Sequence, residues 1–293
     1  MTDETLILGA SGFLGSYFAR AMGQRAVHHS TSRLYLPNSS QNDTVISRLD
    51  SESDIESVLN GDRFSRVINC VALANIDECE ANPEKAHWVN SEIPRILAEK
   101  SSERNINLVH ISTDAIFDGK GGPYTEVASA NPISVYGKTK FLGEEMVRNS
   151  NPGAYIFRVN FFGMKSRGNS LFNFFFNAIQ DKKQVMGFDD VLFTTMYAQH
   201  TAELALEILE KCESGIYNLV GSETLSKYDF GVMVGAEFGL PPEWLLRGSV
   251  DSSTGGNLRS KNLCLDNSKI LRYGLKPPSI GDGIRNLVSE LTR

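Results

Sequence analysis

The sequence predicts an α/β protein: a Rossmann-type, doubly wound parallel sheet with a smaller C-terminal α/β substrate lobe. The first apolar run of the chain, at residues 5–8, ends in the glycine turn Gly9-x-x-Gly12-x-x-Gly15. Apolar runs then alternate with helical segments as far as residue 160, the pattern of repeated strand and helix pairs. With 293 residues, the chain has room for one large domain and an appendage.

The elements follow from hydrophobic periodicity and from Gly and Pro punctuation. We expect strands at residues 5–8, 66–71, 107–111 and 154–159, and a further strand ending within residues 26–33. We expect helices at residues 16–22, 83–104, 134–148, 170–180 and 198–210. The dinucleotide-binding domain should occupy residues 1–160, rejoined by about residues 191–220, and residues 161–293 should form mainly the substrate-binding lobe. Ligands of such open sheets bind at the carboxyl ends of the strands.

The glycine turn has the spacing of a dinucleotide-binding loop. Gly9 permits a tight turn, Gly12 lets backbone amides approach a pyrophosphate, and Gly15 allows close packing of helix on strand. The following helix directs unpaired amides and the positive end of its dipole at the anion. The cofactor contacts expected here come from Gly9, Ser11, Gly12, Phe13, Leu14 and Gly15.

The segment after the expected second strand indicates which cofactor is used. An NAD enzyme places an Asp or Glu about 20 residues beyond the turn to hold the adenosine ribose. Residues 26–33 contain no carboxylate, whereas Arg33 and nearby hydroxyls could meet a 2′-phosphate. The sequence therefore favours NADP(H), with NAD(H) as the alternative if Arg33 is only a solvated loop residue.

Three polar side chains supply the groups that a carbonyl reduction needs. Tyr136 precedes Lys140 by four residues on an expected helix, which places both on one face. A neighbouring ammonium favours phenolate and would bring the pKa of Tyr136 closer to neutral. Thr113 ends an expected strand, where its hydroxyl can donate to a carbonyl oxygen.

Together these features resemble the extended short-chain dehydrogenase/reductase superfamily. Within it the chain is most similar to the dTDP-4-dehydrorhamnose reductase branch, which includes the reductase-like regulatory subunit of methionine adenosyltransferase. The resemblance is carried by Gly9 to Gly15, Asn69-Cys70-Val71-Ala72, Val89-Asn90, Ile111 to Gly119, Val135 to Glu144, Gly215 to Gly221, Ser226-Lys227-Tyr228-x-Phe230, and Arg259 ahead of Leu265-Asp266.

The resemblance implies a reaction and a set of site residues. The C4 ketone of a nucleotide-diphosphate deoxyhexose would accept hydride from NAD(P)H, with Tyr136 as proton donor. Thr113, Tyr136 and Lys140 would be catalytic, and Lys140 would also bind the nicotinamide ribose. Further cofactor contacts would come from Asp50, Val71, Ala72, Asn90 and Ser112. Substrate contacts would come from Ala74, Ile76, Thr113, Ala115, Asn160, Phe161 and Arg259.

The chain departs from the rhamnose-pathway pattern on its substrate side. Ala115 stands where Tyr is usual after Ser-Thr-Asp, and Ser260 stands where proline is common. Residues 159–161 and 188–195 also differ from the usual motifs. A different ketosugar or nucleotide therefore remains open, as do a nucleotide-sugar epimerase and a non-catalytic NADP-binding regulatory subunit. A 4,6-dehydratase is disfavoured, because it would have an acid pair after Thr113.

Composition excludes other classes of function. The net charge is −6 and the basic residues are scattered, which argues against nucleic-acid binding. No apolar run approaches a membrane span and no signal peptide is evident, so we expect a cytoplasmic protein. The four cysteines lack zinc or disulfide spacing, and adjacent His28 and His29 point to opposite faces of a strand, so no metal is expected. The expected partner is a nucleotide-sugar small molecule, and a homodimer is left open.

Overall fold

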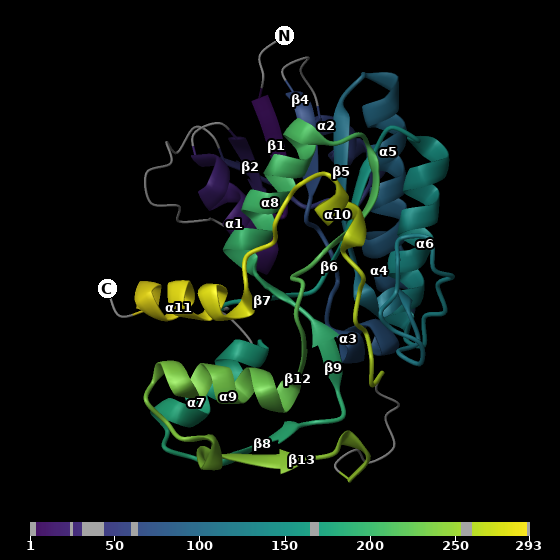
Figure 1. Cartoon of the computed structure of the whole chain (residues 1–293). Helices are drawn as coiled ribbons and strands as arrows, with labels where there is room; N and C mark the ends of the chain where they lie inside the picture. Colours follow the sequence, from purple (N-terminus) through teal and green to yellow (C-terminus); the bar gives the residue numbers. More distant parts are fainter. Residues whose placement is uncertain are drawn as a thin grey trace. The chain divides into compact units, whose positions relative to one another are not determined.

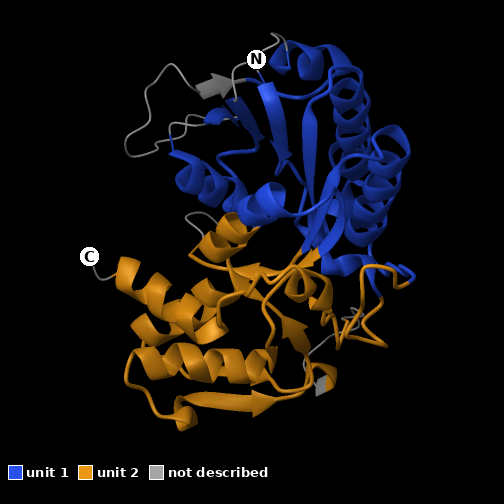
Figure 2. Ribbon diagram, turned by 45° about the horizontal axis from the view of Figure 1, so that its top comes forward, with its two compact units in different colours: residues 1–117, 129–158, 205–217 blue, residues 118–128, 159–204, 218–293 orange. Residues whose placement is uncertain are grey.

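The computed structural model of this chain forms two compact units (Figure 2). It describes residues 4–23, 26–30, 44–59, 64–164, 170–252 and 260–291. The first unit consists of residues 1–117, 129–158 and 205–217, and the second of residues 118–128, 159–204 and 218–293. Arg33 and Arg259, two of the expected binding residues, lie outside the described residues.

The first unit carries a seven-stranded sheet, and its elements as far as residue 159 have the purple to teal colours of Figure 1. In chain order they are β1 (Glu4–Leu8), α1 (Phe13–Met22), β2 (Ala26–Ser30), β3 (Thr44–Ile46), α2 (Glu52–Val58), β4 (Phe64–Asn69), α3 (Ile76–Ala81), α4 (Pro83–His87), the π-helical turn η3 (Trp88–Glu92), α5 (Ile93–Glu103), β5 (Asn107–Thr113), the 3-10 turn η4 (Asp114–Ile116), α6 (Val135–Ser150) and β6 (Tyr155–Val159). Two later elements, α8 (Ala198–Lys211) and β11 (Gly215–Leu219), have residues in both units.

The strand order confirms the predicted fold class. The sheet reads β11-β6-β5-β4-β1-β2-β3, and β1 pairs in parallel with both β2 and β4. The chain runs outward from β1 to β3 and then returns to β4 on the other side of β1, so the order reverses between β1 and β4. Crevices at such reversal points are where open α/β sheets bind ligands. The late strand β11 joins the sheet beside β6.

Apolar strands explain why the sheet is covered on both faces. Leu6 and Leu8 belong to a buried cluster that also holds Val67 and Leu108. Ile7, which points to the opposite face, is equally buried. Strands of a parallel sheet are apolar on both faces because helices cover each side. Helices α5 and α6 pack side by side in this covering layer (Figure 1).

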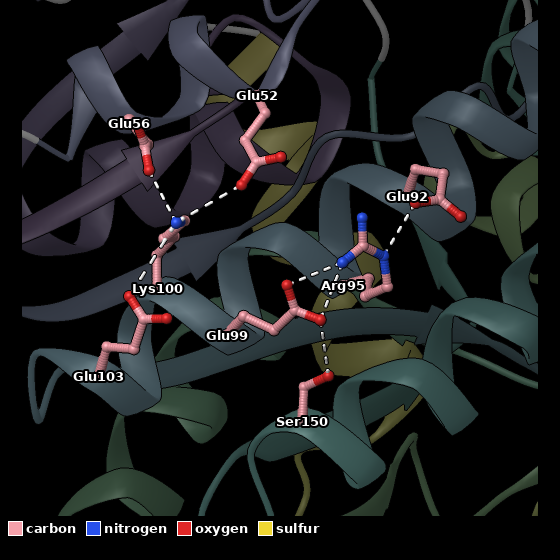
Figure 3. A network of polar contacts seen from close by, with 8 residues as sticks. All are labelled: Glu52, Glu56, Glu92, Arg95, Glu99, Lys100, Glu103 and Ser150. Carbon is pink, nitrogen blue, oxygen red and sulfur yellow. Dashed lines mark hydrogen bonds and ion pairs between the residues drawn. The ribbon is translucent and has the colours of Figure 1, made fainter.

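Ion pairs connect the exposed sides of the covering helices (Figure 3). Lys100 on α5 lies 2.7 Å from Glu56 and 3.4 Å from Glu52, both on α2. Arg95 lies 2.7 Å from Glu99, one turn further along α5. Because these groups are exposed or only partly buried, their contribution to stability is small, and the apolar sheet faces remain the main source of cohesion.

The expected continuous helix at residues 83–104 is interrupted by the turn η3. Pro94, the second residue of α5, has no N–H, so the carbonyl of Asn90 lacks its usual donor four residues later. That carbonyl instead faces Gly143 of α6, where any Cβ would overlap with it. The interruption thus results from one proline and allows α6 to pack closely on η3.

The second unit contains short strands that pair two at a time. Its elements are β7 (Phe161–Phe162), α7 (Leu171–Gln180), β8 (Val185–Phe188), β9 (Leu192–Thr194), β10 (Met196–Tyr197), β12 (Thr224–Ser226), α9 (Lys227–Glu237), the 3-10 turns η5 (Pro242–Trp244) and η6 (Val250–Ser252), β13 (Leu245–Gly248), α10 (Ser268–Arg272) and α11 (Ile280–Leu291). The strand pairs are β7 with β10, β9 with β12 and β8 with β13.

Phe172 and Phe175 of α7 are buried, and Phe175 packs against Phe230 and Trp244, as the helical spacing of the phenylalanines predicts. Among the described residues, no helix is long and apolar enough to cross a bilayer.

Candidate active site

The glycine turn joins β1 to α1 at the point where the strand order reverses. Gly9 has a φ of +76°, a region that favours glycine, and its carbonyl accepts a 2.8 Å hydrogen bond from the Gly12 N–H. Gly12 is the N-cap of α1 and supplies no side-chain cap. The first turn of α1 therefore presents backbone amides and the positive end of the helix dipole without a capping side chain.

Close backbone contacts explain why positions 9 and 15 are occupied by glycine. A Cβ on Gly9 would lie 3.1 Å from the backbone of Cys70 and Val71, which follow β4. A Cβ on Gly15 would overlap with the Gly9 carbonyl oxygen. The turn thus packs closely against the backbone that follows β4, and the Ala10 N–H donates to the His29 carbonyl at 3.0 Å; this arrangement fits the approach of a dinucleotide pyrophosphate.

Gly15→Ala is expected to destabilise the fold and weaken dinucleotide binding. Its Cβ meets backbone atoms that no rotamer change can move, and overpacking of this kind costs about 1–3 kcal/mol. The free energy of unfolding in urea and the Kd for NADPH by fluorescence titration should both change, the latter at least about tenfold. The matched control is Gly153→Ala, whose Cβ would make an ordinary 3.5 Å contact with Asn151. An unchanged NADPH Kd in Gly15→Ala would contradict the pyrophosphate assignment.

The three candidate reacting groups come from β5 and α6. Thr113 is the last residue of β5, and Tyr136 and Lys140 lie on the first two turns of α6. The Ser134 side chain caps α6 by accepting the Gly137 N–H at 3.1 Å. Gly137 lies against the Ala115 carbonyl, where a Cβ would overlap. This close approach brings the start of α6 to the end of β5.

The Tyr136 hydroxyl lies close enough to the Thr113 side chain for the two to interact. Burial of the phenol raises the pKa of Tyr136 to about 12, and the Thr113 contact opposes that rise. The expectation that Lys140 would lower the pKa of Tyr136 is wrong for this structure. The Lys140 ammonium group lies instead 2.6 Å from the Ile111 carbonyl, and desolvation dominates at Tyr136. A phenol with a raised pKa remains protonated at neutral pH.

Lys140 is fully enclosed, and polar groups from β5 surround its nitrogen. The side chain is 1% exposed. Its Nζ donates to the Ile111 carbonyl and lies 3.4 Å from His110 Nε2. Burial lowers the pKa of Lys140 to about 8, and the nearby Glu144 carboxylate opposes this. A buried lysine with a lowered pKa in a ligand-binding crevice is a candidate functional group.

A buried ion pair lies one helical turn beyond Lys140. Glu144 Oε2 lies 2.8 Å from Arg158 Nη2, and the two side chains are 0% and 4% exposed. Ser112 donates its hydroxyl to Glu144. The Arg158 guanidinium also lies over the Phe117 ring, 5.5 Å from its centroid. This arrangement commits the Ser112 hydroxyl, expected to contact the cofactor, to supporting the end of β5.

Asn90 acts on the loop after β4 through its side-chain amide. It accepts the Leu73 N–H at 2.9 Å, donates to the Leu73 carbonyl at 3.1 Å, and donates to Thr139 at 3.1 Å. The loop that follows β4 is thereby fixed to α6. Both Asn90 N–H groups are used within the protein, so any cofactor contact of its amide would have to come through the oxygen.

Most of the other expected binding residues in the first unit are exposed. Ala72, Ala74 and Ile76 follow β4 and are exposed. Asp50 is exposed and forms a 2.7 Å ion pair with Arg48. Val71 donates its N–H to Asn69 Oδ1 at 3.0 Å. These positions remain predicted contacts.

The expected substrate residues divide between the two units. Ala115 follows Thr113 in the first unit and donates its N–H to the Thr113 hydroxyl at 3.2 Å. Asn160 and Phe161 belong to the second unit, where the Asn160 carbonyl accepts the Met196 N–H at 3.2 Å. The described residues hold no group of three His, Cys, Asp or Glu side chains suited to a metal ion.

Four buried residues around Lys140 were missed by sequence reasoning: Asn69, His110, Glu144 and Arg158. Each is at most 3% exposed. One local signal was available, because Glu144 follows Lys140 by four residues and so shares its helix face. The others come from separate strands, and no short motif connects them.

Comparison with known proteins identifies relatives of this chain. A family model described as RmlD substrate binding domain matches residues 3–293. The probable low-salt glycan biosynthesis reductase Agl14 of Haloferax volcanii is 30% identical over 290 residues, which cover 96% of this chain and 96% of that protein. Methionine adenosyltransferase 2 subunit beta of Xenopus tropicalis is 28% identical over 286 residues, covering 93% and 83%. The solved structure of dTDP-4-dehydrorhamnose reductase from Bacillus anthracis in complex with NADP matches with a TM-score of 0.82 and 20% identity, covering 99% and 100%.

Proposed function

Because the chain belongs to the RmlD substrate binding domain family, we propose that it reduces a nucleotide-sugar ketone with a nicotinamide cofactor. The substrate class is a nucleotide-diphosphate deoxyhexose with a ketone at C4. The observation that carries the proposal is the placement of Thr113, at the carboxyl end of β5, next to Tyr136 at the start of α6, with Lys140 one turn further along α6.

The residues suit a reduction. When bound, a reduced nicotinamide supplies the hydride. Tyr136, whose pKa is raised to about 12, holds its proton at neutral pH and can give it to the oxygen that becomes an alkoxide. The Thr113 hydroxyl, which donates to Asp114 Oδ1 at 3.0 Å in this structure, can turn to donate to the same oxygen and stabilise the charge as it forms.

The glycine turn supports a nicotinamide dinucleotide as cofactor, and NADP(H) is the proposed preference. This preference rests on the sequence around Arg33, where a guanidinium and hydroxyls replace the carboxylate of NAD enzymes. The Bacillus anthracis reductase was solved with NADP. The same assay run with NADPH and NADH, on wild type and on Arg33→Ala, measures the preference directly.

The proposal is tested with the purified chain and a panel of dTDP- and UDP-linked 4-keto-deoxyhexoses. NADPH oxidation and formation of the corresponding 4-hydroxy sugar are expected with at least one of them. Conversion of a sugar without net loss of NADPH would indicate an epimerase instead. NADPH oxidation measured in parallel without any sugar gives the background rate to be subtracted.

A second candidate is a cofactor-binding regulatory subunit without turnover. It is supported by the 28% identity to methionine adenosyltransferase 2 subunit beta over 93% of this chain. Tight NADPH binding with no sugar reduced, together with a change in the activity of an added methionine adenosyltransferase catalytic subunit, would favour it. The intact Thr113, Tyr136 and Lys140 favour the reductase.

A further inference from the structure

The first turn of α6, which carries Tyr136, is held by a side chain from another helix. The first N–H groups of any α-helix have no acceptor within the helix. In α6 the Ser134 hydroxyl accepts the Gly137 N–H at 3.1 Å. The Val135 N–H donates instead to Glu80 Oε1 at 2.8 Å. Glu80 belongs to α3, so this hydrogen bond joins two separate elements of the first unit.

The charge of Glu80 suits its place at the start of α6. The first turn of α6 contains no acidic residue, whereas Lys138 and Lys140 both lie near this end of the helix. The helix dipole makes negative charge favourable and positive charge unfavourable at a helix N-terminus. Glu80 therefore supplies from α3 the negative charge that α6 lacks in its own first turn.

The loop that leads into α3 is tied to α6 at a second point. Cys79 Sγ of α3 donates to the Leu73 carbonyl at 3.2 Å. Leu73 is also bonded to the side chain of Asn90, which donates to Thr139 of α6 at 3.1 Å. The contacts between α3 and α6 thus form a closed circuit, through Glu80 on one side and through Leu73 and Asn90 on the other. A displacement of α3 would therefore disturb the start of α6.

This circuit closes around Tyr136. Tyr136 directly follows Val135, so the hydrogen bond from Val135 to Glu80 fixes the backbone that carries the phenol. Cys79, the residue before Glu80, is fully buried and lies close enough to the Tyr136 phenol for the two groups to interact. Helix α3 therefore contacts α6 both at the phenol and at the residue that precedes it.

We propose that Glu80 is a positioning residue for the reduction, because its carboxylate holds the first turn of α6 and thereby the Tyr136 hydroxyl in the place from which the proton is given. The proposal rests on the proposed function, which assigns Tyr136 as proton donor. Helix α3 begins at Ile76, a predicted substrate contact that is 53% exposed. Glu80 thus also keeps this predicted contact and the proton donor at a fixed separation.

Two conservative substitutions separate position from charge. Glu80→Gln keeps an oxygen at the same reach and loses the charge, whereas Glu80→Asp keeps the charge and withdraws the oxygen by one methylene. Positioning predicts that kcat for sugar reduction stays within about threefold of wild type in Glu80→Gln. It predicts a fall of about 5–20-fold in Glu80→Asp and Glu80→Ala, because small displacements of a reacting group are costly. The opposite order, with Glu80→Asp more active than Glu80→Gln, would mean that Glu80 acts through its charge alone and would overturn the proposal.

The NADPH Kd and the stability of the fold show whether the effect is specific. The Kd should stay within about threefold in all three variants, since a misplaced proton donor lowers kcat and leaves cofactor binding unchanged. Glu84→Ala, which removes an exposed carboxylate from the neighbouring helix α4, is the matched control and should retain wild-type kcat. A lower urea midpoint in Glu80→Ala with unchanged kcat would identify a cap that only stabilises the fold, and the proposal would then be wrong.

Two measurements on the full chain without ligand keep this test independent of the reaction. Hydrogen exchange at the Val135 amide should become at least about fivefold faster in Glu80→Asp and Glu80→Ala and should change little in Glu80→Gln, because a first-turn amide has no other acceptor in its helix. The ¹³Cζ signal of Tyr136, assigned by its loss in Tyr136→Phe, should move in the same two variants. A Tyr136 signal that stays in place in every variant would overturn the positioning role. Absence of sugar reduction in the wild type, with these shifts present, would instead mean that the proposed function is wrong.

Discussion

Tyr136→Phe is expected to lower the rate of sugar reduction by about 10²–10⁴-fold, the usual contribution of a positioned proton donor. The phenyl ring retains the packing of the tyrosine but has no proton to give. The Thr113 hydroxyl loses one partner and retains its contacts with Asp114 at 3.0 Å and with the Ala115 N–H at 3.2 Å. The NADPH Kd should therefore stay within about threefold, and kcat should carry the loss.

Tyr155→Phe provides the matched control for this experiment. Tyr155 also donates its hydroxyl to a single protein partner, the Cys212 carbonyl at 2.9 Å, but it lies on β6 away from Thr113. Its kcat should equal that of wild type. If Tyr136→Phe retains full turnover, another group is the proton donor and the assignment fails.

The proposed reacting groups and the glycine turn could be located from the sequence because each is part of a local pattern. The glycine turn follows a strand, Tyr136 and Lys140 share a helix face, and Thr113 ends a strand. Each pattern fits within a few residues and has a physical reason that does not require the fold. The doubly wound sheet could be predicted for the same reason, since its strands and helices alternate.

The buried polar groups near Lys140 could not be predicted, because they meet only in the folded sheet. Asn69 ends β4, His110 lies in β5, and the residues are 41 apart in sequence. Their contact depends on the pairing of β4 with β5, in which Asn69 and His110 are direct partners. No propensity marks an isolated Asn or His as buried, so only the register reveals the pair.

Other elements of the fold were not predicted, each for a specific physical reason. The helix α2 was not expected, although Ser51 and Asp54 form a capping box that the sequence carries. The strand pairs of the second unit were not expected because two- to four-residue strands have too little periodicity to detect. Of the expected substrate residues, Asn160 and Phe161 follow β6 as predicted, but a role in binding rests on the family resemblance alone.

Arg158→Met is expected to cause the largest loss of stability, about 3–5 kcal/mol in the free energy of unfolding. The substitution leaves the Glu144 carboxylate, 0% exposed, without its counter-charge in a region that water does not reach. The Ser112 hydroxyl would remain as a hydrogen-bond donor to Glu144. Urea unfolding followed by circular dichroism measures the change, and a lower midpoint with an unchanged slope would identify a loss of stability.

The double variant Glu144→Leu/Arg158→Met tests two explanations for the loss of stability. Either the ion pair itself stabilises the protein, or Arg158→Met is costly only because it leaves the Glu144 charge buried and unpaired. Replacing both charges with apolar groups removes the uncompensated carboxylate, so most of the stability should return. The return should be incomplete, because the Ser112 hydroxyl then loses its acceptor, at a cost of about 1–3 kcal/mol. The exposed pair Glu207 and Lys211 is the control, and Lys211→Met should leave the urea midpoint unchanged. A double variant no more stable than Arg158→Met would mean that the ion pair itself, and not the avoidance of a lone buried charge, stabilises the end of β5 beneath Thr113.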